Sequence, residues 1–144
     1  MAFYRIKAAG SNNAALNSVI AKVCSIASQN QNTDLLFLVS QIQVAKDDDR
    51  IEQIFGEDAF KRLVKKRESI STGVGIKIEL QPYDYLKNNN HRAHGRTVVV
   101  LNPSVRDLGS ILQTTGASIN WIVVEMHMDG ELDSWVQTNK ASDI

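Results

Sequence analysis

Near the end of the chain, Glu125, His127 and Asp129 alternate along a segment that follows an apolar run. Side chains two residues apart on a strand share one face, so these three could bind one metal ion or transfer a proton. A strand that leaves the core also becomes polar where it meets solvent, and Asp129-Gly130 is an ordinary turn pair. These residues are the catalytic candidates of the least favoured hypothesis, a metal-dependent hydrolase.

Two turns, Gly10-Ser11-Asn12-Asn13 and Asn102-Pro103-Ser104, come before segments with helical spacing. The first turns of a helix expose backbone N–H groups, which favour a phosphate or a carboxylate. An ordinary N-cap accounts for the same residue types, and neither a dinucleotide fingerprint nor a Walker loop is present. Ser40 follows an apolar run in the same way. The candidate ligand-binding residues are Gly10, Ser11, Asn12, Ser40, Asn102 and Ser104.

The segment 83–96 is the longest stretch without a regular pattern, and it ends in a basic sequence. Its cations could contact a phosphate backbone while Tyr83 or Tyr85 stacks on a base. A solvated loop is the alternative, and zero net charge disfavours nucleic-acid binding. His91 and His94 could also join His127 in a three-histidine metal site, although no sequence feature brings them together. The candidate nucleic-acid or partner-binding residues are His91, Arg92, His94 and Arg96.

Candidate residues at strand ends can form one site only if their strands are neighbours in a sheet. The hydrophobic pattern predicts these strands. Continuous apolar runs at 35–39, 98–101 and 122–124 are typical of parallel strands covered on both faces. Alternating patterns at 3–8 and 70–81 favour edge strands with one face in water. The order of the strands stays open. If the three central strands are parallel, Ser40, Asn102, Ser104, Glu125 and His127 gather along one rim of the sheet, where such folds bind ligands.

Helical spacing separates the strands. The pattern predicts helices over 13–29, over 47–69 with a break at Gly56, after Ser104, and after Gly130. The polar residues 139–144 are expected to fray. We therefore expect a single α/β domain over 1–144, a three-layer α/β/α fold with about five strands in a Rossmann-like arrangement.

Composition limits the function classes. Sixteen Lys and Arg residues balance sixteen Asp and Glu residues, so no overall field draws the protein to nucleic acid or to an anionic membrane. Apolar runs are far shorter than the roughly 20 residues of a membrane span. The single cysteine, Cys24, and an opening without a secretory pattern predict a cytoplasmic protein.

No pattern identifies a reaction or a cofactor, and no metal is assigned, so whether the protein is an enzyme stays open. We expect a binding module that recognises a small anionic or nucleotide-like ligand at the carboxyl ends of the central strands. The alternatives are a protein-interaction or assembly subunit, such as a homodimer, and a nucleic-acid-associated protein that uses the 83–96 loop.

Overall fold

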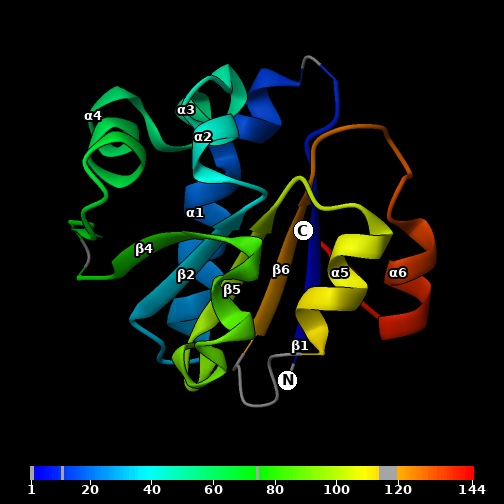
Figure 1. The fold of residues 1–144 in the computed structure, drawn as a ribbon. Helices are drawn as coiled ribbons and strands as arrows, with labels where there is room; N and C mark the ends of the chain where they lie inside the picture. The colour runs from blue at the N-terminus through cyan, green and yellow to red at the C-terminus, as the bar shows by residue number, and fades with distance from the viewer. Residues whose placement is uncertain (1, 11, 74, 114–119) are drawn as a thin grey trace.

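The computed structural model describes residues 2–10, 12–73, 75–113 and 120–144, and these residues form one mostly parallel sheet with helices on both faces (Figure 1). The sheet order among the described residues is β3-β4-β2-β5-β6-β1-β7. The strands are β1 (Ala2–Lys7), β2 (Asp34–Val39), β3 (Ile70–Ser71), β4 (Lys77–Pro82), β5 (Thr97–Leu101), β6 (Asn120–Glu125) and β7 (Ser142–Asp143). The predicted α/β fold is confirmed.

The three continuous apolar runs form β2, β5 and β6, which are neighbours in the sheet and parallel to one another. Each is covered by helices on both faces, which is why its residues are apolar without interruption. The strands with alternating patterns, β1 and β4, flank this centre in parallel, but they are not the edge strands that we expected. The sheet has two more strands than expected, because the short β3 and β7 extend it beyond β4 and β1.

The predicted strand over 70–81 is two strands. Gly75 has a φ of +80°, and its N–H donates to Thr72 O (3.0 Å), so the chain reverses between β3 and β4. Glycine adopts this backbone conformation without strain, whereas an alternating apolar pattern alone does not reveal the turn. The pair β3–β4 lies at one edge of the sheet, and the charged Lys77 on β4 is exposed.

Two helical layers cover the sheet, with α1 to α4 on one side and α5 and α6 on the other (Figure 1). Alternate residues of β2 divide between the two cores. Leu35, Phe37 and Val39 pack with the α1 side, while Leu36 and Leu38 pack with the α5 side. The helices are α1 (Asn13–Gln29), α2 (Ile42–Ala45), α3 (Asp49–Phe55), α4 (Glu57–Phe60), the π-helical η1 (Lys61–Lys65), the 3₁₀ turns η2 (Tyr83–Lys87) and η3 (Asn90–Ala93), α5 (Val105–Leu112) and α6 (Asp133–Asn139).

Gly56 breaks the helical segment 47–69 as predicted, since α3 ends at Phe55 and α4 begins at Glu57. Its φ of +86° is the conformation in which a residue other than glycine is strained. The 83–96 loop is largely ordered by the core, because Leu86 and Ala93 are fully buried against the α5 side of the sheet. None of the described helices is long and apolar enough to cross a membrane.

The expectation that 139–144 frays is wrong. Asn139 is the last residue of α6, and Ser142 and Asp143 then pair with Tyr4 and Arg5 of β1. The N–H of Ile144 also donates to Arg5 O (3.0 Å). The polar tail is ordered because the Asp143 carboxylate binds Arg5. The alternating strand pattern alone places Arg5 in solvent.

The connections leave the carboxyl ends of neighbouring strands on opposite faces. After β2 the chain enters α2 on the α1 side, whereas after β4 and β5 it enters η2 and α5 on the other side. Diverging connections open a crevice at the carboxyl edge of a parallel sheet. The elements that border this crevice on the α5 side are η2 and α5.

Candidate functional site

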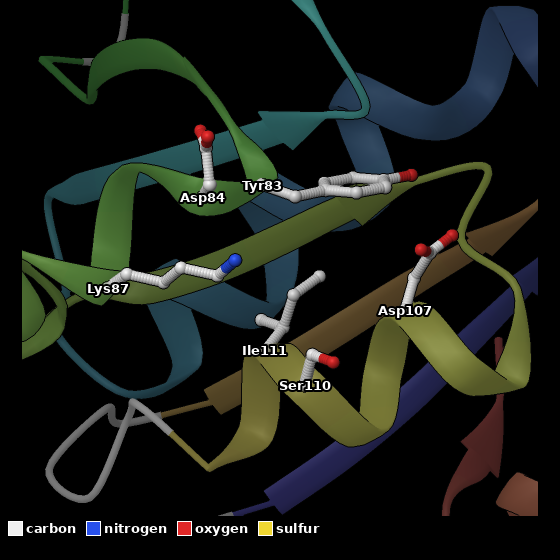
Figure 2. Close-up of a pocket in the computed structure, with 6 residues that line it drawn as sticks. All are labelled: Tyr83, Asp84, Lys87, Asp107, Ser110 and Ile111. Carbon is white, nitrogen blue, oxygen red and sulfur yellow. The ribbon is translucent and has the colours of Figure 1, made fainter.

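A cleft of about 160 Å³ lies between η2 and α5, beside the carboxyl ends of β4 and β5. Figure 2 shows Lys87 extending from η2 toward the wall formed by α5. Lining residues on the η2 side are Tyr83, Asp84 and Lys87, and those on the α5 side are Asp107, Ser110 and Ile111. We name this space the η2–α5 cleft.

The η2 wall is anchored by Tyr83, the first residue after β4. Its hydroxyl donates to Leu101 O at the end of β5 (2.5 Å), so the side chain spans the position of β2, which lies between these two strands. Burial, together with the negative charge of Asp107, raises the pKa of Tyr83 above its ordinary value. The phenol therefore stays protonated at neutral pH and keeps donating. Four residues further along, Lys87 stands one turn away with its side chain exposed.

The α5 wall is fixed at its first turn. Ser104 accepts from the N–H of Asp107 through its side chain, and Asp107 Oδ2 accepts from the N–H of Ser104 (both 3.0 Å). This reciprocal capping box satisfies two backbone donors at the start of α5. Asn102 makes the sharp exit from β5 with a φ of +56°, while its N–H donates to Val124 O (2.9 Å). Asp107 is thus held in position beside the cleft.

The η2–α5 cleft carries charges of both signs, with Lys87 and Asp84 on the η2 side and Asp107 on the α5 side. Lys87 forms no ion pair with Asp107 or with any other described residue. An ammonium group, two carboxylates and the Ser110 hydroxyl can orient a small polar ligand that carries both an anionic group and a hydrogen-bond donor. The lining residues include neither histidine nor cysteine.

The predicted ligand-binding residues follow strand ends at the expected rim but do not line this cleft. Asn12 caps α1, with its side chain accepting from the N–H of Ala15 (3.1 Å), and Ser104 caps α5. Gly10 turns with a φ of +72°, Ser40 is exposed after β2, and Ser11 lies outside the described residues. Asn12 and Ser104 are therefore ordinary N-caps, as in the alternative interpretation. Asn102 and Ser104 affect the cleft only indirectly, because they position α5.

A second, open hollow of about 710 Å³ lies beyond the end of β2. Asp47, Asp48 and Asp49 line it together with Arg50, whose guanidinium binds Asp48 and donates to Met126 O (3.0 Å). Three carboxylates around one paired arginine repel an anion. This part of the rim therefore gives no support to the predicted anionic ligand.

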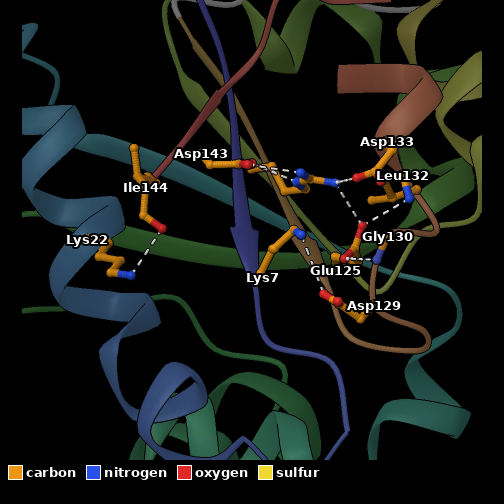
Figure 3. Close-up of polar contacts among 10 residues, drawn as sticks. Lys7, Lys22, Glu125, Asp129, Gly130, Leu132, Asp133, Asp143 and Ile144 are labelled. Atoms are coloured by element: carbon orange, nitrogen blue, oxygen red, sulfur yellow. Dashed lines mark hydrogen bonds and ion pairs between the residues drawn. The ribbon is translucent and has the colours of Figure 1, made fainter. Parts of the chain in front are cut away.

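The predicted grouping of Glu125, His127 and Asp129 does not form. The strand ends at Glu125, whose buried carboxylate accepts from Arg5 Nη1 (3.1 Å) and from the N–H groups of Gly130 and Leu132 (2.9 Å each) (Figure 3). His127 and Asp129 are exposed, and Asp129 pairs with Lys7 (3.5 Å). Among the described residues, no three histidine, cysteine or acidic side chains are placed to hold a metal ion. Glu125 secures the turn after β6.

The basic sequence that ends the 83–96 loop lies by the amino ends of β2 and β4, away from the carboxyl rim. His91, Arg92, His94 and Arg96 line a hollow of about 450 Å³ there. Arg96 is buried and paired with Asp34 (3.0 Å) and Glu79 (2.9 Å), so it has a structural role. The three-histidine alternative is not formed by the described residues, since His127 follows the carboxyl end of β6.

The sequence interpretation missed the cleft residues Tyr83, Lys87, Asp107 and Ser110. The sequence pattern singles out Tyr83 only as a ring that could stack on a base, and it gives Asp107 and Ser110 no role. The available signal was that Tyr83 directly follows a strand, which matters once β4 is known to lie parallel to β2. No protein-family model, curated protein or solved structure matches this chain. Its function is therefore inferred from the geometry and chemistry of its residues.

Proposed function

We propose that this protein is a binding module whose η2–α5 cleft takes a small ligand with an anionic group, such as a carboxylate, a phosphate or part of a nucleotide. The observation that carries the proposal is the position of the cleft, beside the carboxyl ends of β4 and β5 where the connections diverge. Anchored walls favour a preformed site, because ordering them costs nothing when the ligand binds.

The volume and charges of the cleft restrict the ligand. A space of about 160 Å³ is below the roughly 300–1,000 Å³ of pockets that enclose drug-sized molecules, so only a small metabolite or one end of a larger ligand enters. Lys87 supplies the contact to the anionic group, while Asp107 and Ser110 accept hydrogen bonds from the same ligand. The two acidic residues favour a ligand that also carries an amino or hydroxyl group.

Thermal unfolding against a panel of nucleotides, phosphorylated metabolites, amino acids and divalent metals tests the proposal. A ligand at 100 times its dissociation constant stabilises the folded state by about 2.7 kcal/mol, which raises the melting temperature measurably. Lys87→Met and Ser110→Phe should each remove the shift, the first by deleting the charge and the second by filling the cleft.

Lys61→Met serves as the matched control, since Lys61 is exposed on η1 and lies outside the cleft. The control should respond to the ligand as the original chain does. A panel without any shift, or a shift that survives both cleft variants, would refute the proposal.

A second candidate function is docking of a protein partner on the carboxyl rim. The large hydrophobic side chains that are exposed among the described residues, Val44 (54%), Val105 (43%) and Met128 (62%), all follow the carboxyl ends of central strands. Exposed apolar side chains gathered in one region are typical of interaction sites. Light scattering on the original chain and on Val44→Ser/Met128→Ser tests self-association. A monomer in both cases removes the homodimer from consideration.

A further inference from the structure

The hollow at the amino ends of β2 and β4 has a chemistry that the proposed function does not use. It measures about 450 Å³, and it is separated from the η2–α5 cleft by the length of the strands. Basic and imidazole groups surround it, namely Lys77, His91, Arg92, His94 and Arg96. We name it the amino-end hollow.

Both carboxylates of the amino-end hollow are paired with the same arginine, Arg96. Arg96 Nη2 donates to Asp34 Oδ1 (3.0 Å) and to Glu79 Oε1 (2.9 Å), and Nη1 donates to Arg92 O (3.2 Å). Glu79 also accepts from Gln81 (2.8 Å). Burial alone would raise the pKa of Glu79, but the Gln81 hydrogen bond and the charges of Arg96 and Arg92 lower it on balance. Glu79 is therefore ionised and bound to Arg96, and its charge also interacts with that of Arg92 although the two form no ion pair.

Two cations at the mouth of the amino-end hollow have no ionic partner. Lys77 and Arg92 are exposed, and neither forms an ion pair with a described residue. Three cations against two carboxylates leave one excess positive charge in the lining even when both imidazoles are neutral. The exposed rings of His91 and His94 add N–H donors at the same mouth.

The loop that carries these groups is held in place from below. Asn32 is buried, its Nδ2 donates to Gly95 O (2.6 Å), and its Oδ1 accepts from the N–H of Thr97 (3.1 Å). Ala93 packs in the core on the α5 side. Two side-chain hydrogen bonds and an apolar contact thus fix the backbone from which Arg92 and the two histidines extend, which reduces the entropy lost on binding.

We propose that the amino-end hollow binds a small phosphate-bearing ligand, with Arg92 and Lys77 as its counter-charges and His91 and His94 as hydrogen-bond donors. Guanidinium and ammonium groups make charge-assisted hydrogen bonds to phosphate oxygens. A long nucleic acid fits less well, because the protein has no net charge and two carboxylates are among the residues that line the hollow.

Isothermal titration of the whole protein with inorganic phosphate at low ionic strength tests this inference. The original chain should bind phosphate saturably, and Lys77→Ala/Arg92→Ala should bind at least about tenfold more weakly, because charged hydrogen bonds are lost. Lys61→Ala/Lys66→Ala is the matched control, since it removes the same two charges from the exposed surface of another part of the chain. Both variants alter exposed side chains, so the fold is retained and thermal melting verifies it.

Three outcomes would overturn the inference: no saturable phosphate binding up to about 10 mM, equal weakening in both double variants, or tighter binding of single-stranded oligonucleotides that grows with their length. Lys87→Ala separates the two sites. Phosphate affinity that is unchanged by Lys87→Ala supports the amino-end hollow, whereas affinity lost only in Lys87→Ala assigns the anion to the η2–α5 cleft instead.

Discussion

At the scale of single residues, Arg5 connects several elements of the described part of the chain. An alternating strand pattern places it in solvent, yet it is buried, and its guanidinium binds three carboxylates, which are among the residues labelled in Figure 3. The distances are 2.6 Å to Asp143, 2.6 Å to Asp133 and 3.1 Å to Glu125. These contacts connect β1 with β6, α6 and β7, so one side chain joins elements that are far apart in sequence.

Replacing Arg5 by methionine should lower the free energy of unfolding by about 3–5 kcal/mol, because it keeps most of the side-chain volume but leaves Glu125 buried without its cation. Urea unfolding followed by circular dichroism measures the change. Lys7→Met is the control, since Lys7 makes only an exposed ion pair with Asp129 and should change the stability by less than about 1 kcal/mol. Equal losses in the two variants would contradict the role given to Arg5.

The contact between Arg5 and Asp143 makes part of the free energy of unfolding depend on pH. The hydrogen bond from Arg5 lowers the pKa of Asp143 below its ordinary value of 3.8. A carboxylate with a lowered pKa in the folded state stabilises that state above its ordinary pKa, and the stabilisation is lost as the pH falls through the folded value. The stability difference between the original chain and Asp143→Asn should therefore be largest near pH 7 and shrink below about pH 4.

Unfolding curves at neutral and acidic pH measure this difference. Asp47→Asn is the matched control, because Asp47 is exposed and forms no ion pair with a described residue. A difference for Asp143→Asn that stays constant with pH would show that its hydrogen bond to Arg5 does not depend on the ionised carboxylate.

At the scale of elements, the local sequence pattern predicts where a helix or strand forms, but it does not predict which strands are neighbours in the sheet. The continuous runs of β2, β5 and β6 had to be central, because strands without a polar face need cover on both sides. The placement of β4 beside β2 was not predictable, since it depends on the long crossover through α2, α3 and α4. The η2–α5 cleft was missed for the same reason: its walls come from segments that only this strand order makes neighbours.

The start of α5 is the element most directly tied to the cleft. Ser104→Ala removes the acceptor for the N–H of Asp107 and should cost about 1 kcal/mol of stability. The substitution leaves the bond from the Ser104 backbone N–H to Asp107 Oδ2 in place, so ligand binding in the η2–α5 cleft should weaken only as far as the first turn of α5 loosens. Ser110→Ala, in the middle of α5, should leave the stability within about 0.5 kcal/mol. Thermal unfolding of both variants makes the comparison, and a loss of similar size in Ser110→Ala would argue against a special role for the cap.

At the scale of the whole molecule, the fold depends on closure between the two ends of the chain. β1 cannot pair until β6 exists, and β7 then covers the outer edge of β1. An unpaired strand edge is a template for association with another chain, and short edge strands reduce this risk. The short strands β3 and β7 occupy the two edges of the described sheet, which opposes the edge-to-edge homodimer considered from the sequence.

Removing residues 140–144 tests this closure. The shortened chain loses β7 and both contacts from Arg5 to Asp143, so it should be less stable and should expose the edge of β1. Light scattering at several protein concentrations should then detect association that the full chain does not show, and melting should occur at a lower temperature. Asp143→Asn in the full chain separates the two effects, because it weakens the ion pair while β7 still covers the edge. If that variant associates as strongly as the shortened chain, the lost charge contact, rather than the uncovered edge, causes the association.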